Sequence, residues 1–251
     1  MQKISEIKEI LNQTSVEQIP VFIEQYKSDS RIGVQNLVKK ADKILNDYQT
    51  EVERTYNLQF FERKYSDYND ICGIDEVGRG PLAGPVVAGA VILPKDCDIL
   101  YINDSKKLSA GKREELAGII LEKAVSAKTA MVSPEYIDEV NILQATFEAM
   151  RKAIASLDVQ PDILLNDAVN IPGVNIKQVP IIKGDAKSIS IGAASIIAKV
   201  TRDAMMVEYD KIYPEYDFAS NKGYGSAKHI EALKKYGPCP IHRKTFIQNF
   251  I

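Results

Sequence analysis

Histidine and cysteine are both scarce in this chain of 251 residues. Its two histidines, His229 and His242, are too few for a metal site built on several imidazoles, so any metal must be bound mainly by oxygen atoms. The three cysteines, Cys72, Cys97 and Cys239, form no CxxC pair and are odd in number, which indicates neither a zinc site nor a disulfide framework. Such cysteine usage is typical of a protein from a reducing cytoplasm.

Long apolar runs and a strong charge of either sign are also absent. No run approaches the roughly 20 residues that a membrane span needs, and the opening sequence MQKISEIKEI lacks the apolar stretch of a secretory signal. We therefore expect a cytoplasmic protein without a membrane partner. The net charge of −2 neither indicates nor excludes a nucleic-acid partner. With 45% hydrophobic and 26% charged residues, the chain is expected to be globular, with one or two domains.

Residues 1–65 are predicted to form a helical extension that is distinct from residues 66–251. From Arg31 onwards, apolar residues recur at intervals of three or four, which is the period of an amphipathic helix. The sequence Thr14-x-x-Glu17 has the spacing of a capping box and predicts the start of a helix. An aromatic group follows, and it consists of Tyr56, Phe60, Phe61, Tyr65 and Tyr68. We interpret these rings as packing residues rather than as a surface for stacking bases, because aromatic residues at helical spacing are usually buried.

After residue 70, short apolar strands alternate with helices. The predicted strands are ICGID from Ile71, VVAGAVIL, Ala127–Val132, Asp162–Asn166 and Val174–Ile182. The predicted helices cover residues 109–124, 188–209 and 226–236, with further helical stretches between Pro134 and Leu157. Interleaved strands and helices indicate an α/β fold. The final segment, FIQNFI, is interpreted as packing residues rather than as a sliding-clamp peptide.

Four acidic residues lie at the ends of predicted strands or just before a predicted helix. They are Asp75 and Glu76 after ICGI, Asp167 after DILLN, and Asp185 before the long helix that starts near Ser188. The carboxyl ends of strands are where α/β folds bind their ligands, and a turn there can bring neighbouring carboxylates to one ion. Carboxylate oxygens suit Mg²⁺ and Mn²⁺. Taken one at a time, each of these residues is interpreted more simply as a cap or a turn residue.

Two glycine-rich turns add groups that suit an anionic substrate. Gly78, Arg79 and Gly80 follow the first pair of acids, and the arginine and the backbone N–H groups would face an anion such as phosphate. The turn has neither a GxxxxGK[ST] nor a GxGxxG pattern, so it is not a nucleotide-binding fingerprint. Tyr224 stands between two glycines in KGYGS, where its ring would stack on a sugar or a base. An ordinary turn tyrosine is the alternative.

Together, these motifs resemble those of bacterial ribonuclease HII, a type 2 ribonuclease H family. The resemblance spans about residues 70–246 and rests on GIDEVGRGPLAGPVVAGAVIL, DSKKLS, KGDAKSISIGAASIIAKVTRD, KGYGS and HRKTF. The most specific part is DEVGRG combined with the long Asp185–Asp203 segment. Ser226 and Gly192 stand where the family usually has threonine and alanine, and neither change touches a carboxylate. Arg79 favours this family over the related ribonuclease HIII, which typically lacks an arginine in this loop.

The resemblance implies a ribonuclease H fold, in which helices flank a mixed five-stranded sheet. It also implies a metal-dependent endoribonuclease that cuts the RNA strand of RNA/DNA hybrids and cuts 5′ of single ribonucleotides in duplex DNA. The ends would be a 5′-phosphate and a 3′-hydroxyl, and the role would be ribonucleotide excision repair and removal of RNA primers. The expected cofactor is Mn²⁺ or Mg²⁺, with two ions when substrate is bound. A monomer is expected.

The same resemblance assigns roles to individual residues. The catalytic and metal-binding residues would be Asp75, Glu76, Asp167 and Asp185. The substrate-binding residues would be Gly78, Arg79, Gly80, Ser105, Lys106, Lys107, Ser188 and Tyr224. In the family, the glycine–arginine–glycine turn reads the 2′-hydroxyl at the RNA–DNA junction. The helical extension is expected to assist substrate binding.

Two other classes of function stay open at this point. A nucleic-acid-binding module without catalysis would keep the fold, but it would not need all four carboxylates. A small-molecule phosphatase would use the same oxygen ligands, but it would leave the Gly78–Gly80 turn and Tyr224 without a role.

Overall fold

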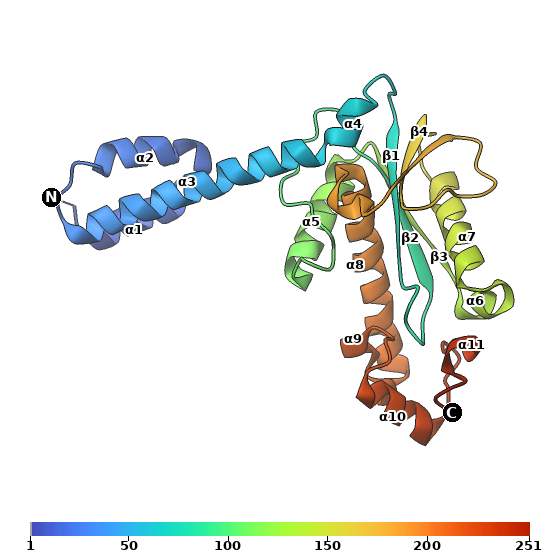
Figure 1. Cartoon of the computed structure of the whole chain (residues 1–251). Helices are drawn as coiled ribbons and strands as arrows, with labels where there is room; N and C mark the ends of the chain where they lie inside the picture. The colour runs from blue at the N-terminus through green and yellow to red at the C-terminus, as the bar shows by residue number, and fades with distance from the viewer. Residues whose placement is uncertain (1) are drawn as a thin grey trace. The chain divides into compact units, whose positions relative to one another are not determined.

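The computed structural model describes residues 2–251, and the chain divides into two compact units, Met1–Asn57 and Leu58–Ile251. The first unit is helical and contains α1 (Ile4–Gln13), the short 3₁₀ helix η1 (Val16–Gln18), α2 (Ile19–Tyr26) and most of α3 (Ile32–Leu58) (Figure 1). Its buried side chains come from all three α-helices and are Ile7, Leu11, Ile19, Phe22, Tyr26, Val34, Val38 and Ala41. The prediction of helices in this part of the chain is confirmed.

The predicted helix start at Thr14 is wrong. Helix α1 ends at Gln13, and the Thr14 hydroxyl donates a hydrogen bond to the Ile10 carbonyl oxygen at 2.7 Å. The chain then makes the 3₁₀ helix after Ser15, and α2 carries Pro20 in its first turn. Proline is tolerated there because its missing N–H would have no partner within the helix. The capping-box spacing therefore identified the right region but not the residue that precedes the helical turn.

The second unit is an α/β domain around one sheet. After α4 (Phe60–Lys64), its strands are β1 (Ile71–Val77), β2 (Val86–Ile92), β3 (Ser126–Val132), β4 (Ile163–Asp167) and β5 (Lys177–Ile181). Its other helices are α5 (Ala110–Lys123), α6 (Pro134–Val140), α7 (Ile142–Ala155), η2 (Gly184–Ala186), α8 (Ile189–Ile212), η3 (Pro214–Tyr216), α9 (Phe218–Asn221), α10 (Ala227–Tyr236) and α11 (Lys244–Ile247).

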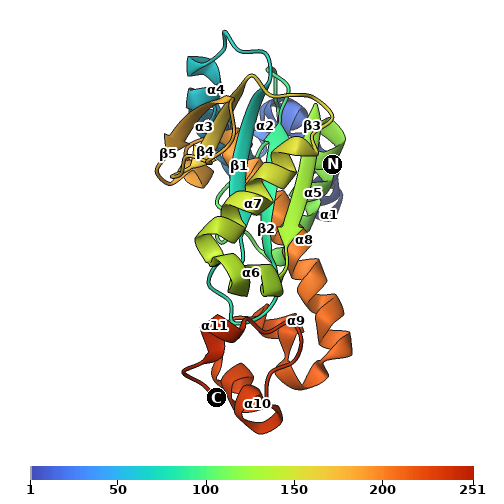
Figure 2. The same ribbon diagram turned by 90° about the vertical axis from the view of Figure 1, so that its right-hand side faces the viewer.

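The sheet has five strands in the order β3-β2-β1-β4-β5. Strands β1, β2 and β3 pair antiparallel, whereas β4 is parallel to both β1 and β5. Helix α7 covers one face of the sheet, and α8 covers the other, with α5 packed against α8 (Figures 1 and 2). This arrangement confirms the predicted mixed five-stranded sheet flanked by helices.

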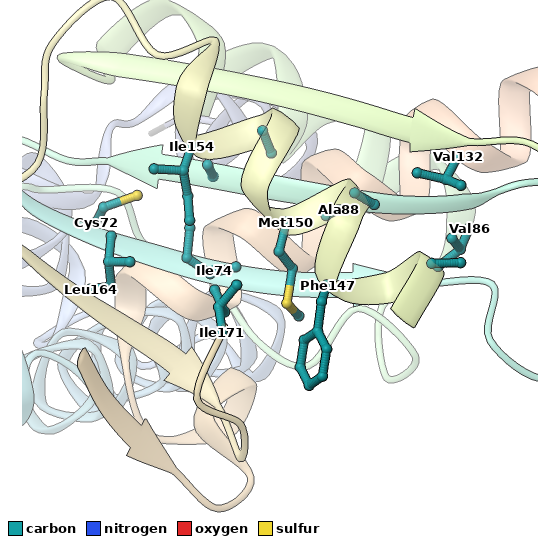
Figure 3. Close-up of a cluster of buried hydrophobic side chains, with 14 of the residues drawn as sticks. Cys72, Ile74, Val86, Ala88, Val132, Phe147, Met150, Ile154, Leu164 and Ile171 are labelled. Atoms are coloured by element: carbon teal, nitrogen blue, oxygen red, sulfur yellow. The ribbon is translucent and has the colours of Figure 1, made fainter. Parts of the chain in front are cut away.

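The core between α7 and the sheet consists mainly of apolar side chains. Ile74 of β1, Ala88 of β2 and Val132 of β3 meet Met150 and Ile154 of α7 (Figure 3). These side chains alternate along their strands, so that one face of each strand points at α7. Burial of this kind stabilises a domain by roughly 25 cal/mol for each Å² of apolar surface removed from water. The core therefore provides a rigid base for the opposite face, which carries α8.

Helix α8 packs directly against the sheet. A Cβ atom at Gly73 of β1 or at Gly89 of β2 would overlap with the backbone of α8, at Ser190 and Ala194 respectively. Glycine at these positions lets the helix approach the strands closely. The prediction that a long helix starts near Ser188 is confirmed, and the Ser188 side chain accepts a hydrogen bond from a backbone N–H of the first turn. The start of α8 is thus fixed against the strands.

The last part of the chain, α9 to α11, packs on the loop that joins β1 to β2 (Figure 2). The Leu82 N–H donates to the Gly223 carbonyl oxygen at 2.8 Å, and the Gly84 N–H donates to the Ile241 carbonyl oxygen at 2.8 Å. Ile247 is fully buried in this region, which confirms the interpretation of FIQNFI as a packing segment. The C-terminal segment from α9 to α11 therefore supports the loop between β1 and β2, which follows Asp75 and Glu76 in the sequence.

The predicted aromatic group divides into two parts. Phe61, Tyr65 and Tyr68 pack against the apolar cluster at the start of β1 and β4, as predicted. Phe60 is 54% exposed and Tyr56 is 59% exposed, so these two rings are not core residues of their units. The helical period alone did not separate the buried rings from the exposed ones.

Candidate active site

Two of the predicted acids lie on neighbouring parallel strands. The register of β1 and β4 aligns Ile74 with Asn166, so the next residues, Asp75 and Asp167, lie side by side at the carboxyl ends of these strands. Asp75 is only 6% exposed, whereas Asp167 is partly exposed. The carboxyl ends of strands are the usual ligand-binding edge of an α/β sheet.

The other two predicted acids are held next to this pair by the local backbone. Glu76 is the next residue of β1, and its Oε1 lies 3.2 Å from Nη1 of Arg79 in an ion pair. Asp185 lies in η2, where the preceding Gly184 donates its N–H to Oδ1 of Asp167 at 2.7 Å. The sequence KGD after β5 therefore brings its aspartate back to the end of β4. We call Asp75, Glu76, Asp167 and Asp185 the acidic group.

Burial and mutual repulsion raise the pKa of three members of the acidic group. Burial is the largest cause for Asp75, and the negative charges of Glu76 and Asp167 add to it, so its pKa lies well above the usual range. Burial also raises the pKa of Glu76, against the opposing effect of its ion pair. The pKa of Asp185 is raised by burial and by the charges of Asp104 and Asp167. The negative charge of Asp167 contributes to the raised pKa of all three, so the acids interact electrostatically.

The donor chemistry of the acidic group fits a hard divalent cation. All four side chains offer carboxylate oxygens, and for Asp75, Glu76 and Asp185 burial together with neighbouring negative charge raises the pKa. Within residues 2–251, no three His, Cys, Asp or Glu side chains already converge in the geometry of a metal centre. The acids are therefore gathered at one edge of the sheet without being closed around a single point.

Ser195 is a site residue that the sequence analysis missed. It lies on α8, is 6% exposed, and forms a hydrogen bond with Asp75 that lowers the pKa of this carboxyl group. Its Oγ is 3.0 Å from Oγ of Ser105, a predicted substrate residue that is itself only 4% exposed. Ser105 therefore reaches the acidic group through Ser195. The available signal was helical spacing, because Ser195 follows Ser188 by seven residues and lies on the same face of α8.

The Gly78–Gly80 turn and Tyr224 lie together, although they are far apart in the sequence. A Cβ atom at Gly80 would be 3.7 Å from Cε1 of Tyr224, and the Tyr224 side chain is 46% exposed. Arg79, between the two glycines, makes the ion pair with Glu76. The turn therefore connects the acidic group on one side to an exposed tyrosine ring on the other.

The two predicted lysines lie on the exposed side of the site. Lys106 and Lys107 are both exposed. The positive charge of Lys106 lowers the pKa of Glu76 and of Asp185, which shows that it faces the acidic group. Its position suits contact with a phosphate that approaches the acids.

Ser188, in contrast, is fully buried. Its hydroxyl donates to Oε1 of Glu62 at 2.5 Å and accepts from the Ile191 N–H at 3.3 Å. Both hydrogen bonds serve the start of α8, and neither leaves the hydroxyl facing solvent. The position argues against direct contact between Ser188 and a substrate and in favour of a capping role.

The fold and the acidic group define a nuclease of the ribonuclease H type. Residues 72–249 match the ribonuclease HII family, and residues 3–66 match the ribonuclease HII N-terminal domain. The chain is 63% identical over 226 residues to ribonuclease HII of Lachnoclostridium phytofermentans, which covers 90% of this chain and 89% of the relative. It is 52% identical over 250 residues to ribonuclease HII of Clostridioides difficile, with 99% and 98% covered. The chain therefore belongs to the ribonuclease HII family.

Solved structures show the same fold. Ribonuclease H2 from Pyrococcus horikoshii is 30% identical with a TM-score of 0.59, over 70% of this chain and 93% of that chain. Ribonuclease HII from Archaeoglobus fulgidus, solved as a complex with PCNA, is 29% identical with a TM-score of 0.59, over 72% and 96%. Bst-RNase HIII in complex with Mn²⁺ is 16% identical with a TM-score of 0.50, over 67% and 63%, and shows the likeness of fold alone. No helix in the described part of this chain is long and apolar enough to cross a membrane.

Proposed function

We propose that this protein is an endoribonuclease that hydrolyses the RNA strand of RNA/DNA hybrids and also cuts 5′ of a single ribonucleotide embedded in duplex DNA. The products would be a 5′-phosphate and a 3′-hydroxyl. One observation carries the proposal: the acidic group, the Gly78–Gly80 turn and Tyr224 adjoin one another at the ends of β1 and β4. A site of this kind combines groups for hydrolysis with groups that read a sugar. Membership of the ribonuclease HII family supports the same activity.

The acidic group would hold Mn²⁺ or Mg²⁺, and two ions are expected when a scissile phosphate is present. Divalent ions bound there would activate the attacking water and stabilise the leaving 3′-oxygen. Because burial raises the pKa values of Asp75, Glu76 and Asp185, protons compete with the cation for these carboxylates, and cation binding should strengthen as the pH rises. Ser195 would keep the Asp75 carboxylate in one orientation through its hydrogen bond.

The basic groups of the site would bind the phosphate backbone. The Arg79 side chain is 45% exposed and pairs with Glu76, so a phosphate at the acidic group lies within reach of the same guanidinium. Lys106 is exposed and faces the acids. These contacts would orient the scissile bond rather than distinguish RNA from DNA.

Selection of the ribonucleotide would come from the turn and the tyrosine. Gly80 has no side chain, and a substrate sugar can therefore approach the backbone of the turn beside the Tyr224 ring. The 2′-hydroxyl is the group that separates RNA from DNA at such a contact. If the scissile phosphate is positioned for hydrolysis only when the 2′-hydroxyl makes this contact, hydrolysis is restricted to sites with a ribose.

Residues 1–65 would add duplex-binding surface to this site without taking part in the chemistry. All the residues that the proposal assigns to hydrolysis or to reading of the sugar come later in the chain. In a cell, the activity would serve the removal of misincorporated ribonucleotides and of RNA primers in the cytoplasm.

Three synthetic duplexes test the proposal: an RNA/DNA hybrid, a DNA duplex with one ribonucleotide, and an all-DNA duplex of the same sequence. With Mn²⁺ or Mg²⁺, the first two should be cut and the third left intact, and chelation of the metal should stop all cleavage. Free nucleotides in the same buffer test the phosphatase alternative, which predicts release of inorganic phosphate. Binding of the duplexes without cleavage in either metal would instead support the non-catalytic alternative.

A further inference from the structure

The segment HRKTF contains two buried polar residues that the proposed chemistry does not use. His242 is 3% exposed and Arg243 is not exposed at all. Both lie in the segment between α10 and α11, which packs on the loop between β1 and β2. Buried polar side chains are expensive unless they are hydrogen-bonded, so their partners indicate what they hold in place.

The Arg243 side chain lies over the Phe246 ring and donates its hydrogen bonds to backbone carbonyl oxygens of the loop that carries the glycine-rich turn. Its Nη1 donates to the carbonyl oxygen of Arg79 at 2.9 Å, and its Nη2 donates to that of Gly78 at 2.5 Å. Its Nε and Nη2 both donate to the carbonyl oxygen of Gly84, at 3.0 and 2.8 Å. Burial lowers the pKa of Arg243 to about 9, which leaves it protonated at neutral pH. One guanidinium thus fixes three peptide groups of this loop.

The direction of these bonds also orients the amides of the turn. In a trans peptide the C=O and the following N–H point in opposite directions, and no cis peptide occurs within residues 2–251. Because the carbonyl groups of Gly78 and Arg79 point at Arg243, the N–H groups of Arg79 and Gly80 point away from it. Neither of these N–H groups donates to an acceptor in the described part of the chain. They are therefore available to a substrate.

His242 is the first member of a hydrogen-bonded chain that ends at Tyr224. The Cys239 N–H donates to Nδ1 of His242 at 3.0 Å, so in the neutral imidazole the proton is on Nε2. This Nε2 is 3.0 Å from Nε2 of His229, which must accept and therefore carries its own proton on Nδ1. Nδ1 of His229 then donates to the Tyr224 carbonyl oxygen at 2.8 Å. The contacts thus determine the tautomer of both rings.

The surroundings of the two imidazoles keep them neutral. Burial lowers the pKa of His229 and, together with the neighbouring imidazole, lowers that of His242 to about 4. Within the described residues, the titratable groups that face the pair are Tyr216 from η3 and Cys239 from the segment after α10. Burial raises their pKa values to about 12 and about 11, so both are uncharged at neutral pH. Phe218 of α9 completes the packing.

We propose that His242 and Arg243 are positioning residues that hold the Gly78–Gly80 turn and Tyr224 at a fixed separation. Arg243 reaches the turn through its carbonyl groups, and His242 reaches the tyrosine through His229. Because His242 and Arg243 are consecutive, one peptide bond connects the support of the turn to the support of Tyr224, the two parts of the site that would read the sugar. The inference rests on the proposed function, in which these two halves read the ribose. We call His229, His242 and Arg243 the His–Arg cluster.

Cleavage at a single embedded ribonucleotide should depend on the separation between the turn and Tyr224 more strongly than cleavage of a long hybrid does. The embedded ribose offers one 2′-hydroxyl, and only one register of the duplex brings it to the turn. A long hybrid offers a ribose in every register, so a loosened site still finds one that reacts. Misplacement of a reacting group by about 1 Å costs on the order of 100-fold in rate when only one geometry is productive.

Two substitutions of His242 separate positioning from simple structural damage. The side-chain oxygen of His242→Asn lies near the place of Nδ1 and keeps the Cys239 bond, but it loses the donor to His229. The side-chain amide of His242→Gln extends to the place of Nε2 and restores that donor. Arg243→Lys keeps the charge but loses the fork that spans several carbonyl groups. Met150→Ala serves as a matched control, because it destabilises the core on the opposite face of the sheet without touching the cluster.

The experiment measures kcat and KM of the full chain for the embedded-ribonucleotide duplex and for the hybrid, with the melting temperature of each variant. His242→Asn and Arg243→Lys should lower kcat on the embedded ribonucleotide by about tenfold or more and on the hybrid by less than about threefold. His242→Gln should recover most of the loss, and Met150→Ala should change both substrates alike.

Two kinds of result would overturn the inference, and they differ in what they mean for the proposed function. Equal losses on both substrates, or equal losses for His242→Asn and His242→Gln, would show that the cluster only supports the fold. The proposed function would stand in that case. If the wild type cuts hybrids but not the embedded ribonucleotide, the junction reading fails, and the positioning role fails with it.

Discussion

The acidic group and the His–Arg cluster are both buried polar regions of the second unit, but they are built in opposite ways. In the acidic group, burial raises the pKa of Asp75, and the nearby negative charges of Glu76 and Asp167 raise it further. In the His–Arg cluster, each guanidinium nitrogen of Arg243 and each nitrogen of the two imidazoles has a hydrogen-bond partner. Under the proposed function a cation would complete the first region, whereas the second finds its partners within the chain.

This difference separates a reacting site from its support. Charge that the protein leaves uncompensated indicates a ligand, because an unpaired buried charge is costly unless something else binds to it. Polar groups that are fully satisfied indicate a fixed geometry instead. The Gly78–Gly80 turn lies between the two regions, since Arg79 pairs with Glu76 while its carbonyl group accepts from Arg243.

The largest effect is expected from Asp75→Asn, which keeps the shape of the side chain and removes one charge from the acidic group. We expect the rate of cleavage to fall by at least about 1,000-fold, because the lost oxygen contributes to transition-state charge stabilisation. Single-turnover cleavage of the hybrid duplex at saturating enzyme measures this change. A variant that retains cleavage with the same dependence on Mn²⁺ concentration would remove Asp75 from the metal site.

The next largest effect is expected at Tyr224. Loss of a stacked ring is worth roughly 1–3 kcal/mol, so Tyr224→Ala should slow cleavage at a single embedded ribonucleotide by about tenfold to 100-fold. Tyr224→Phe keeps the ring and should be milder, unless the hydroxyl orients the phosphate. The two variants are compared on the embedded-ribonucleotide duplex and on the long hybrid. If Tyr224→Ala slows neither substrate, the tyrosine does not read the junction.

Gly80→Ala tests whether the turn meets the substrate backbone closely. A Cβ atom there would lie 3.7 Å from the Tyr224 ring, an ordinary contact, so the free protein should accept the methyl group without loss of stability. We expect cleavage of both ribose-containing duplexes to fall by about tenfold, through steric exclusion of the sugar. An unchanged melting temperature is the control. Full activity of this variant would show that the sugar does not approach Gly80.

The comparison also predicts how the acidic group affects stability in the absence of metal. The folded pKa of Asp75 is raised above the unfolded value of about 3.9, so the native state binds more protons, and stability is lost as the pH rises through this range. Asp75→Asn should remove this loss and raise the metal-free melting temperature at pH 7 by about 2–4 °C. Mg²⁺ should stabilise the wild type more than the variant. A lower melting temperature for metal-free Asp75→Asn would contradict the proposed repulsion.

The smallest effect on the chemistry is expected from removal of the first unit. Deletion of residues 1–57 should raise KM or Kd for the duplex by about tenfold while kcat changes little, because the acidic group is untouched. Deletion of residues 1–65 should in addition lower the melting temperature, since it removes Phe61, Tyr65 and the carboxylate of Glu62 to which the Ser188 hydroxyl donates. An equal loss of kcat in both truncations would show that the extension supports the reaction itself.

Much of the fold followed from patterns that are local in the sequence. Helices were predicted to start near Ser109 and near Ser188, and both side chains accept a backbone N–H of the first turn of α5 and α8. Strand β4 was predicted from its short apolar run, to within one residue. The predicted start at Thr14 failed because Ser15 is an equally suitable capping type, and only the end of α1 decides which residue precedes the helical turn.

The acidic group was predictable because each of its members marks the end of a strand or the entrance to a helix. Ser195 and the His–Arg cluster were not, since their partners lie far away in the sequence. Arg243 bonds to Gly78 across 165 positions, and no periodic pattern carries information at that range. The same holds for Ser188. The resemblance predicted that this residue contacts the substrate, but in the structure its hydroxyl is buried and donates to Glu62.

The most direct test of the proposed activity is cleavage of a DNA duplex that contains one ribonucleotide, with Mn²⁺ and with a chelator in its place. Denaturing gels and end-labelled strands locate the cut and identify its ends. The expected result is one cut on the 5′ side of the ribonucleotide, with a 3′-hydroxyl on the upstream fragment, a 5′-phosphate on the ribonucleotide, and no cut in the chelator. A cut on the 3′ side, or cleavage that persists without divalent metal, would contradict hydrolysis by the acidic group.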